Sequence, residues 1–216
     1  MEINGKTLDL YQAKTPGAPL VLLNSYMRSR GDVFQKCSEL GCPDFSLAEV
    51  SGLNWDDDMS PWAFPPYGGR ADDYLRELTE AVIPTAIAAL GTEPQRMLLA
   101  GYSLAGLFAL YAATKCDLFE AVASCSGSLW YPDFRAYITA CDAAGLPKAV
   151  WLSLGDREAR TRHPLLRTVE DNTRAIAAVL SERGVRTAFE MNKGNHFQQA
   201  TLRTAKGIKW ILEQTV

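Results

Sequence analysis

The sequence has little of what several protein classes require. It contains only two histidines, His163 and His196, and its 22 basic residues are balanced by 25 acidic ones, giving a net charge of −3. A chain of this charge offers no basic surface of the kind that nucleic acids bind. It also lacks a Gly-x-Gly-x-x-Gly stretch and a phosphate-binding loop, so we expect no cofactor.

The cysteines argue against a metal site as well. There are five, an odd number, without a Cys-x-x-Cys pair. Cys37 and Cys42 could supply two ligands, but no histidine or second cysteine pair completes a zinc set. Free thiols in a reducing cytoplasm are the simplest interpretation of these residues: Cys37, Cys42, Cys116, Cys125 and Cys141.

Because the N-terminus shows no basic segment followed by an apolar one, we expect no signal peptide and a cytoplasmic protein.

One long stretch without charge, Met97–Thr114, has about the length of a minimal membrane-spanning helix. Two glycines, a serine and two tyrosines within it favour a buried strand that leads into a buried helix instead. We therefore expect no membrane partner.

The length and composition, 216 residues with 47% hydrophobic and 22% charged residues, suit a soluble protein with one core, so a single domain is expected over residues 1–216. Whether it is a monomer or a homodimer is left open.

Short apolar strands alternate with helices, which predicts a mostly parallel sheet covered by helices on both faces. Strands are predicted at 2–11, 20–24, 45–50, 97–100, 121–125, 149–154 and 185–191, and helices at 31–40, 72–90 (interrupted by Pro84), 104–114, 168–183 and 201–214.

The stretch around Ser103 carries the first functional signal. The apolar run Met97–Ala100 ends at Gly101, and a helix rich in Ala and Leu begins just past Ser103. A nucleophilic serine at such a strand-to-helix elbow sits in a strained backbone conformation, so the residues two positions before and after it must be small. Gly101 and Ala105 meet that demand, although glycine is usual at the second position. The alternative is a buried turn that contains a serine by chance.

A serine hydroxyl needs a base, usually histidine, and the base needs an acid to orient it. His196 follows the last predicted strand, whereas His163 lies in a polar loop, so His196 is the candidate base. The acid is expected just past the penultimate strand, where Glu158 and Asp156 both remain possible. Glu158 is favoured because a carboxylate a few residues beyond the strand can fold back behind the imidazole.

The oxyanion that forms during acyl transfer must be met by preorganised N–H donors. Leu104, the residue after the nucleophile, is expected to supply one. The second is expected from the loop after the strand 20–24, where Tyr26 is the better placed.

Four segments resemble the Putative esterase branch of the α/β-hydrolase superfamily. They are the elbow Gly101–Leu110, Met59–Trp62, Ser124–Trp130 and Gly194–Phe197. That branch holds siderophore esterases, feruloyl esterases and esterase-D-like enzymes, and the resemblance runs from about residue 20 to the C-terminus. The resemblance implies an α/β-hydrolase fold. In such relatives the acid tends to follow a strand-end glycine by three residues, and the matching residue here is again Glu158.

The sequence departs from this pattern in three ways. It is short, which suggests that there is no separate lid domain; it carries Ala105; and Asn24-Ser25 replaces the familiar His-Gly or Asp-Gly after the first buried strand.

We therefore expect a serine hydrolase that cleaves small-molecule carboxylic esters through an acyl-enzyme. Aromatic residues of the long loop 51–70 and Trp130 are expected to line its substrate pocket, with Trp62 and Trp130 foremost, although at least two of this set would be ordinary core: Trp55, Trp62, Phe64, Tyr67 and Trp130. Asp56–Asp58 in that loop lacks the spacing of a calcium site and is predicted to be a solvated turn. A thioesterase or small-peptide hydrolase with the same triad, and a non-catalytic binding protein of this fold, are the alternatives.

Overall fold

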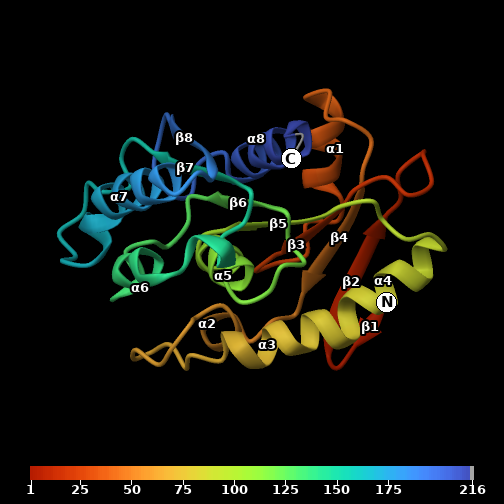
Figure 1. Ribbon diagram of the computed structural model, residues 1–216, viewed down its shortest axis with the longest axis horizontal. Coiled ribbons are helices and arrows are strands. Elements are labelled where there is room, and N and C mark those ends of the chain that lie inside the picture. Colours follow the sequence, from red (N-terminus) through yellow and green to blue (C-terminus); the bar gives the residue numbers. More distant parts are fainter. Residues whose placement is uncertain (215–216) are drawn as a thin grey trace.

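The computed structural model describes residues 1–214, which contribute eight strands to one sheet in the order β1-β2-β4-β3-β5-β6-β7-β8 (Figure 1). Strands β3 to β8 are parallel to one another, while β1 and β2 form an antiparallel edge in which β2 pairs with β4. The strands are β1 (Glu2–Ile3), β2 (Lys6–Tyr11), β3 (Leu20–Asn24), β4 (Ser46–Ser51), β5 (Met97–Tyr102), β6 (Ala121–Cys125), β7 (Ala149–Gly155) and β8 (Arg186–Asn192).

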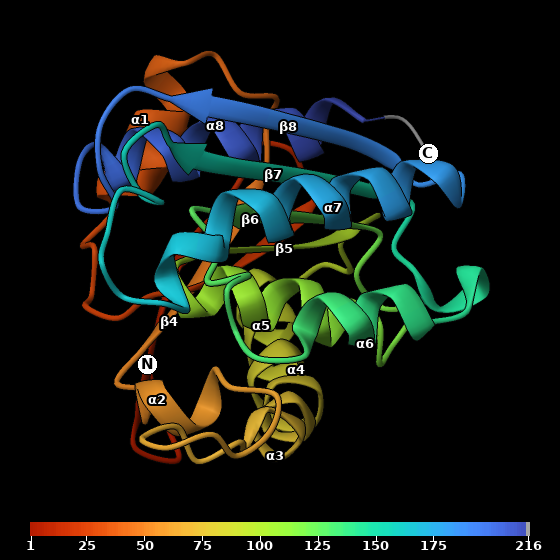
Figure 2. The same cartoon turned by 90° about the vertical axis from the view of Figure 1, so that its left-hand side faces the viewer.

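Helices cover both faces of the sheet, as the sequence predicted. Helices α1 and α8 pack together on one face, and α5 and α7 lie on the other, where α3 and α6 pack against them in turn (Figure 2). The helices are α1 (Asp32–Glu39), α2 (Trp55–Asp58), α3 (Ala71–Glu77), α4 (Ile83–Leu90), α5 (Leu104–Ala113), α6 (Phe134–Ala140), α7 (Val169–Glu182) and α8 (Ala200–Glu213). No helix within residues 1–214 is both long and apolar enough to span a bilayer.

Strand β5 lies at the centre of the sheet and leads directly to Ser103. It lies between β3 and β6, and its residues pair in parallel register, with Leu99 opposite Leu22 on one side and Val122 on the other. Strands buried on both faces are nearly continuous apolar runs, which explains why 20–24, 97–100 and 121–125 could be recognised. The carboxyl ends of β3, β5, β6, β7 and β8 consequently meet at one edge of the sheet.

Several local predictions were wrong or incomplete. The first strand is a hairpin of β1 and β2, because Asn4 and Gly5 turn the chain with φ of 50° and 80°. The triplet Asp56–Asp58 belongs to the short helix α2 and is not a solvated turn: Asp58 is buried and accepts the Asn54 N–H at 3.0 Å, so it caps its own helix. Helix α6 was not predicted.

Pro84 does not interrupt the long helical segment that contains it. A π-helical turn, Leu78–Val82, joins α3 to α4, and Pro84 lies in the first turn of α4. Proline in a helical segment lacks the N–H of the i→i−4 hydrogen bond and its ring crowds the preceding turn; here the wider π-helical turn directly precedes it.

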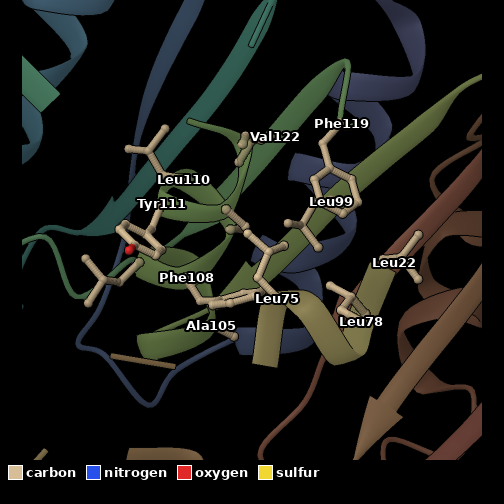
Figure 3. Packing of buried hydrophobic residues seen from close by; sticks show 14 of the residues in the cluster. Leu22, Leu75, Leu78, Leu99, Ala105, Phe108, Leu110, Tyr111, Phe119 and Val122 are labelled. Atoms are coloured by element: carbon tan, nitrogen blue, oxygen red, sulfur yellow. The ribbon is translucent and has the colours of Figure 1, made fainter. Parts of the chain in front are cut away.

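The core on the α5 side of the sheet contains the most completely buried helix. All ten residues of α5 are buried, and Phe108 is fully enclosed among Leu75, Leu99 and Val122 of the same apolar cluster (Figure 3). The Phe108 ring also packs on that of Tyr74, with ring centroids 5.1 Å apart. Because α5 starts directly at Ser103, the packing of this helix fixes where the elbow lies.

We expect Phe108→Ala to lower the free energy of unfolding by about 3–5 kcal/mol, since it leaves a cavity that rigid neighbours fill poorly. Urea denaturation measures this, with an unchanged slope against denaturant concentration. Leu118→Ala, at a side chain that is 37% exposed, is the control and should change stability by less than about 0.5 kcal/mol. Equal losses in the two variants would contradict the assignment of α5 as the central packing element.

Candidate active site

Ser103 occupies the sharp turn between β5 and α5. Its backbone has φ 61° and ψ −124°, a conformation that costs free energy for any residue with a side chain. The Ser103 N–H donates to the Cys125 carbonyl at 3.1 Å, and the Ser103 carbonyl accepts the Ser128 N–H at 3.0 Å. A Cβ at Gly101 would collide with the Ala105 carbonyl, so the tight elbow requires glycine before the serine and accepts alanine after it.

His196 lies against this serine. Its Nε2 is 2.9 Å from Ser103 Oγ, and its imidazole is about three-tenths exposed. The loop that carries it is held at two points: Tyr102 Oη donates to the His196 carbonyl at 2.6 Å, and the Gly194 N–H donates to Asp156 Oδ1 at 2.8 Å. The other histidine, His163, is exposed and accepts the N–H groups of the turn that follows it.

Glu158 is the carboxylate that contacts the imidazole. Its Oε2 is 2.7 Å from His196 Nδ1, so its side chain, 4% exposed, completes a Ser103–His196–Glu158 chain of hydrogen bonds. Asp156, the alternative acid, is exposed and holds the histidine loop instead. The structure thus places the two candidate acids in different positions, one behind the ring and one beneath the loop.

The second oxygen of Glu158 accepts three hydrogen bonds. The donors are Ser126 Oγ at 2.8 Å, the Gly155 N–H at 2.6 Å and Arg203 Nη1 at 2.9 Å. Arg203, on α8, is 1% exposed and also donates to the Lys193 carbonyl at 3.2 Å. Sequence analysis did not find Arg203, because an arginine in an amphipathic helix normally indicates a solvated face.

Opposing effects set the ionisation of Glu158. Burial acts to raise its pKa, but the hydrogen bond and charge of His196, the Gly155 N–H and Ser126 outweigh burial and hold the pKa below its ordinary value of 4.5. Hydrogen bonds to a carboxylate stabilise its charged form. Glu158 is therefore an anion at neutral pH, suited to orienting a histidine that donates from Nδ1.

The two expected oxyanion donors each border a cavity that Ser103 also lines. Leu104 is the first residue of α5, so its N–H has no helical acceptor and lies at the positive end of the helix. Tyr26 follows β3 in the loop that lines the same cleft as Ser103, and its ring packs edge-on against Trp55 with centroids 5.3 Å apart. The neighbouring Asn24 is turned into the core, where its Oδ1 accepts Tyr74 Oη at 2.5 Å.

Two cavities meet at Ser103 and His196. The first, about 580 Å³, lies along the loop after β3 and is lined by Tyr26, Met27 and Arg28 among others. The second, about 510 Å³, lies below the end of β6 and is lined by Tyr67, Trp130 and Arg157 among others. Trp55 and Phe197 border both, so the cleft extends to either side of the serine.

Trp62 does not line this cleft, contrary to the prediction. Its ring packs against the rings of Tyr111, Tyr131 and Tyr137, with centroids 5.6 to 6.4 Å apart. The helix that sequence analysis missed, α6, supplies part of that packing and explains the error. Phe64 likewise lies outside both cavities, whereas Trp130 lines the second one.

The geometry can be compared with known proteins. A model of the family described as Putative esterase matches residues 51–201, more than half of the chain. The chain belongs to this esterase family. The family model includes the elbow, the acid loop and the histidine loop.

Solved structures agree on the fold of this esterase family member. An IroE-like serine hydrolase from Shewanella oneidensis superposes with a TM-score of 0.77 at 16% identity, covering 96% of this chain and 76% of that one. The siderophore hydrolase EstA from Aspergillus nidulans superposes with a TM-score of 0.75 at 19% identity, covering 96% and 89%. The uncharacterized protein YbbA of Bacillus subtilis is 25% identical over 93% of this chain and 88% of its own length. The predicted α/β-hydrolase fold is confirmed.

Within residues 1–214, no three His, Cys, Asp or Glu side chains are placed to hold one ion. Ser103, His196 and Glu158 are joined in series by hydrogen bonds of 2.9 and 2.7 Å at the carboxyl edge of the sheet.

We expect the stability contributed by Glu158 to depend on pH. Because its folded-state pKa is lowered, this contribution is fully present above the ordinary value of 4.5 and is lost as the pH falls through the folded-state pKa. The free energy of unfolding of Glu158→Gln should therefore be lower than that of the wild type by roughly 3 kcal/mol at pH 7, with a smaller difference below pH 4.5. Glu170→Gln, in an i,i+4 pair with Arg174, is the control. A Glu158→Gln difference that stays constant down to pH 3 (about one unit below the ordinary glutamate pKa) would contradict this account.

Arg203 should be energetically coupled to Glu158. We expect Arg203→Met alone to cost about 3–5 kcal/mol, since it leaves a buried carboxylate without its cation. The double variant Arg203→Met/Glu158→Gln should be more stable than the sum of the single changes by about 1–3 kcal/mol. Urea denaturation at neutral pH measures all four proteins, with Arg174→Met as an exposed arginine control. Simple additivity would show that the two side chains stabilise the fold independently.

Proposed function

We propose that this chain is a serine hydrolase that cleaves carboxylic esters, with Ser103 as nucleophile, His196 as general base and Glu158 as orienting acid. The observation that carries the proposal is the continuous chain of contacts from Ser103 Oγ through both nitrogens of His196 to a buried carboxylate, at 2.9 and 2.7 Å. Membership of the esterase family supports the same reaction class. No other described histidine lies near an elbow serine.

In the proposed reaction, Ser103 Oγ attacks the ester carbonyl carbon while its proton passes to His196 Nε2. The carbonyl oxygen becomes an oxyanion that the N–H groups of Leu104 and Tyr26 stabilise, each donor being worth roughly 3–4 kcal/mol in the transition state. His196 then returns the proton to the leaving alkoxide, and the alcohol departs. Water, deprotonated by His196, attacks the acyl-enzyme in the same way and releases the carboxylic acid.

Glu158 acts in this scheme through His196. Its Oε2 accepts the Nδ1–H, which leaves Nε2 free of a proton and directed at the serine. When the imidazole gains its second proton, the buried anion stabilises the imidazolium.

The cleft suggests the size of the ester. Because cavities of about 580 and 510 Å³ extend on opposite sides of the serine, we propose that one holds the acyl group and the other the alcohol. Tyr67 and Trp130 in the second cavity favour an aromatic or other planar group there. One structure with this fold is described as a siderophore hydrolase, so a siderophore ester belongs among the substrates tested, beside acyl thioesters and aminoacyl amides.

The proposal is tested by labelling with a fluorophosphonate probe, followed by mass spectrometry of the modified peptide. We expect one adduct, on Ser103, and turnover of an aryl ester that falls at least about 10³-fold in Ser103→Ala and in His196→Ala. The folding of each variant is checked by thermal denaturation.

His163→Ala is the matched control, since it removes the other histidine of the chain and should leave labelling unchanged. Esterase activity that survives Ser103→Ala in a folded protein would overturn the proposed nucleophile. A folded wild type that takes up no probe and turns over no ester or thioester would favour a binding protein of this fold.

A further inference from the structure

Helix α1 ends in a specific hydrogen-bond pattern. The Gly41 N–H donates to the Ser38 carbonyl at 3.0 Å, the Cys42 N–H donates to the Cys37 carbonyl at 3.0 Å, and Gly41 has φ 66°. These two bonds and the left-handed glycine define a Schellman motif. In this motif the side chains at the positions of Cys37 and Cys42 contact each other and are usually apolar. Here the contact joins two thiols.

The backbone brings the two cysteines within bridging distance. Standard bond lengths on either side of the 3.0 Å hydrogen bond between Cys42 N and Cys37 O limit the separation of the two Cα atoms to less than about 7 Å, the range within which disulfides close. The side chains of Cys37 and Cys42 also share the apolar cluster on the α1 and α8 face of the sheet. A bridge therefore requires side-chain rotation and little movement of the chain.

The two thiols differ in environment. Cys37 is fully buried, and its Sγ lies 3.9 Å from the Ala205 carbonyl of α8. Cys42 is partly exposed. The hydrogen bond from Cys37 lowers the pKa of Cys42, with a further contribution from the positive charge of Lys209, whose Nζ donates to the Gly41 carbonyl at 3.3 Å. An accessible thiol with a lowered pKa beside a buried second thiol is the arrangement found at redox-sensitive sites.

We propose that Cys37 and Cys42 form a thiol–disulfide exchange site that reacts with small-molecule disulfides and closes an internal disulfide at the end of α1. The Cys42 thiolate attacks one sulfur of the small disulfide; that S–S bond breaks, and one thiolate leaves. Cys37 then loses its proton and attacks Cys42 Sγ, which releases the second half as a thiolate. The protein is oxidised by two electrons and the small disulfide is reduced to two thiols.

This site is independent of the proposed hydrolase chemistry. Neither cysteine lines the cleft beside Ser103, and both thiols lie on the face of the sheet that α1 and α8 cover. Loss of exchange would consequently leave the assignment of the nucleophile untouched, and the reverse also holds.

The test is incubation of the folded, reduced protein with oxidised glutathione near neutral pH, followed by mass spectrometry without reduction. We expect a product about 2 Da lighter than the reduced protein, as two hydrogens are lost, with a Cys37–Cys42 cross-linked peptide. Cys37→Ser should instead accumulate a mixed disulfide on Cys42, and Cys42→Ser should form neither product.

Cys116→Ser and Cys141→Ser are the matched controls, because these thiols are also partly exposed and should not be needed for the bridge. In the native wild type, Cys42 should react with iodoacetamide on the order of tenfold faster than Cys116, whose pKa is raised by burial. Glutathione attached to Cys116 or Cys141 as quickly as to Cys42, or a bridge from Cys37 to the buried Cys125, would overturn the proposal.

Discussion

A buried ion pair between Arg203 and Glu158 holds together the strand ends at the candidate active site. Charges taken out of water are tolerated when they are paired and hydrogen-bonded, and here the partners of both terminal nitrogens of Arg203 come from several strand ends. Arg203 donates to Tyr102 at the end of β5, to Ser126 after β6, to Glu158 after β7 and to the Lys193 carbonyl after β8. The loops that carry the acid and the histidine are consequently tied to one guanidinium, which links their positions to the docking of α8.

The strained backbone at Ser103 is stabilised by packing on the α5 face of the sheet, opposite the face that α8 covers. Ser103 has a costly backbone conformation, and such conformations persist only where the surroundings determine them. Helix α5 is buried along its whole length, and Gly106 approaches Gly127 and Ser124 so closely that a Cβ there would force its neighbours to move. Packing of α5 under β5 and β6 therefore stabilises the turn, while the Arg203 network positions the groups that face it.

Much of this site could be predicted from the sequence because its signals are local. The elbow requires small residues at fixed positions around Ser103, and His196 and Glu158 each follow a strand that could be recognised from its own residues. The positions of Arg203 and Trp62 depend on tertiary packing, which leaves no such signal. Arg203 is an arginine in an amphipathic helix, and Trp62 differs from Trp55 only in which neighbours surround it. The Asp58 prediction failed for the same reason, since capping of α2 is decided by how the loop folds back.

Helix α8 contacts both the candidate active site and the Cys37–Cys42 pair, through different residues along its length. Arg203, near its first turns, reaches the strand ends, while Ala205 and Lys209 contact the end of α1. Disulfide formation at Cys37 would change the side chain packed on Ala205 but would bring no charge near Glu158. Since electrostatic effects on the triad depend on nearby charge and hydrogen bonds, the ionisation of Glu158 is insulated from the redox state of α1. The fold thereby places the Cys37–Cys42 pair and the Arg203–Glu158 network against the same helix at separate positions.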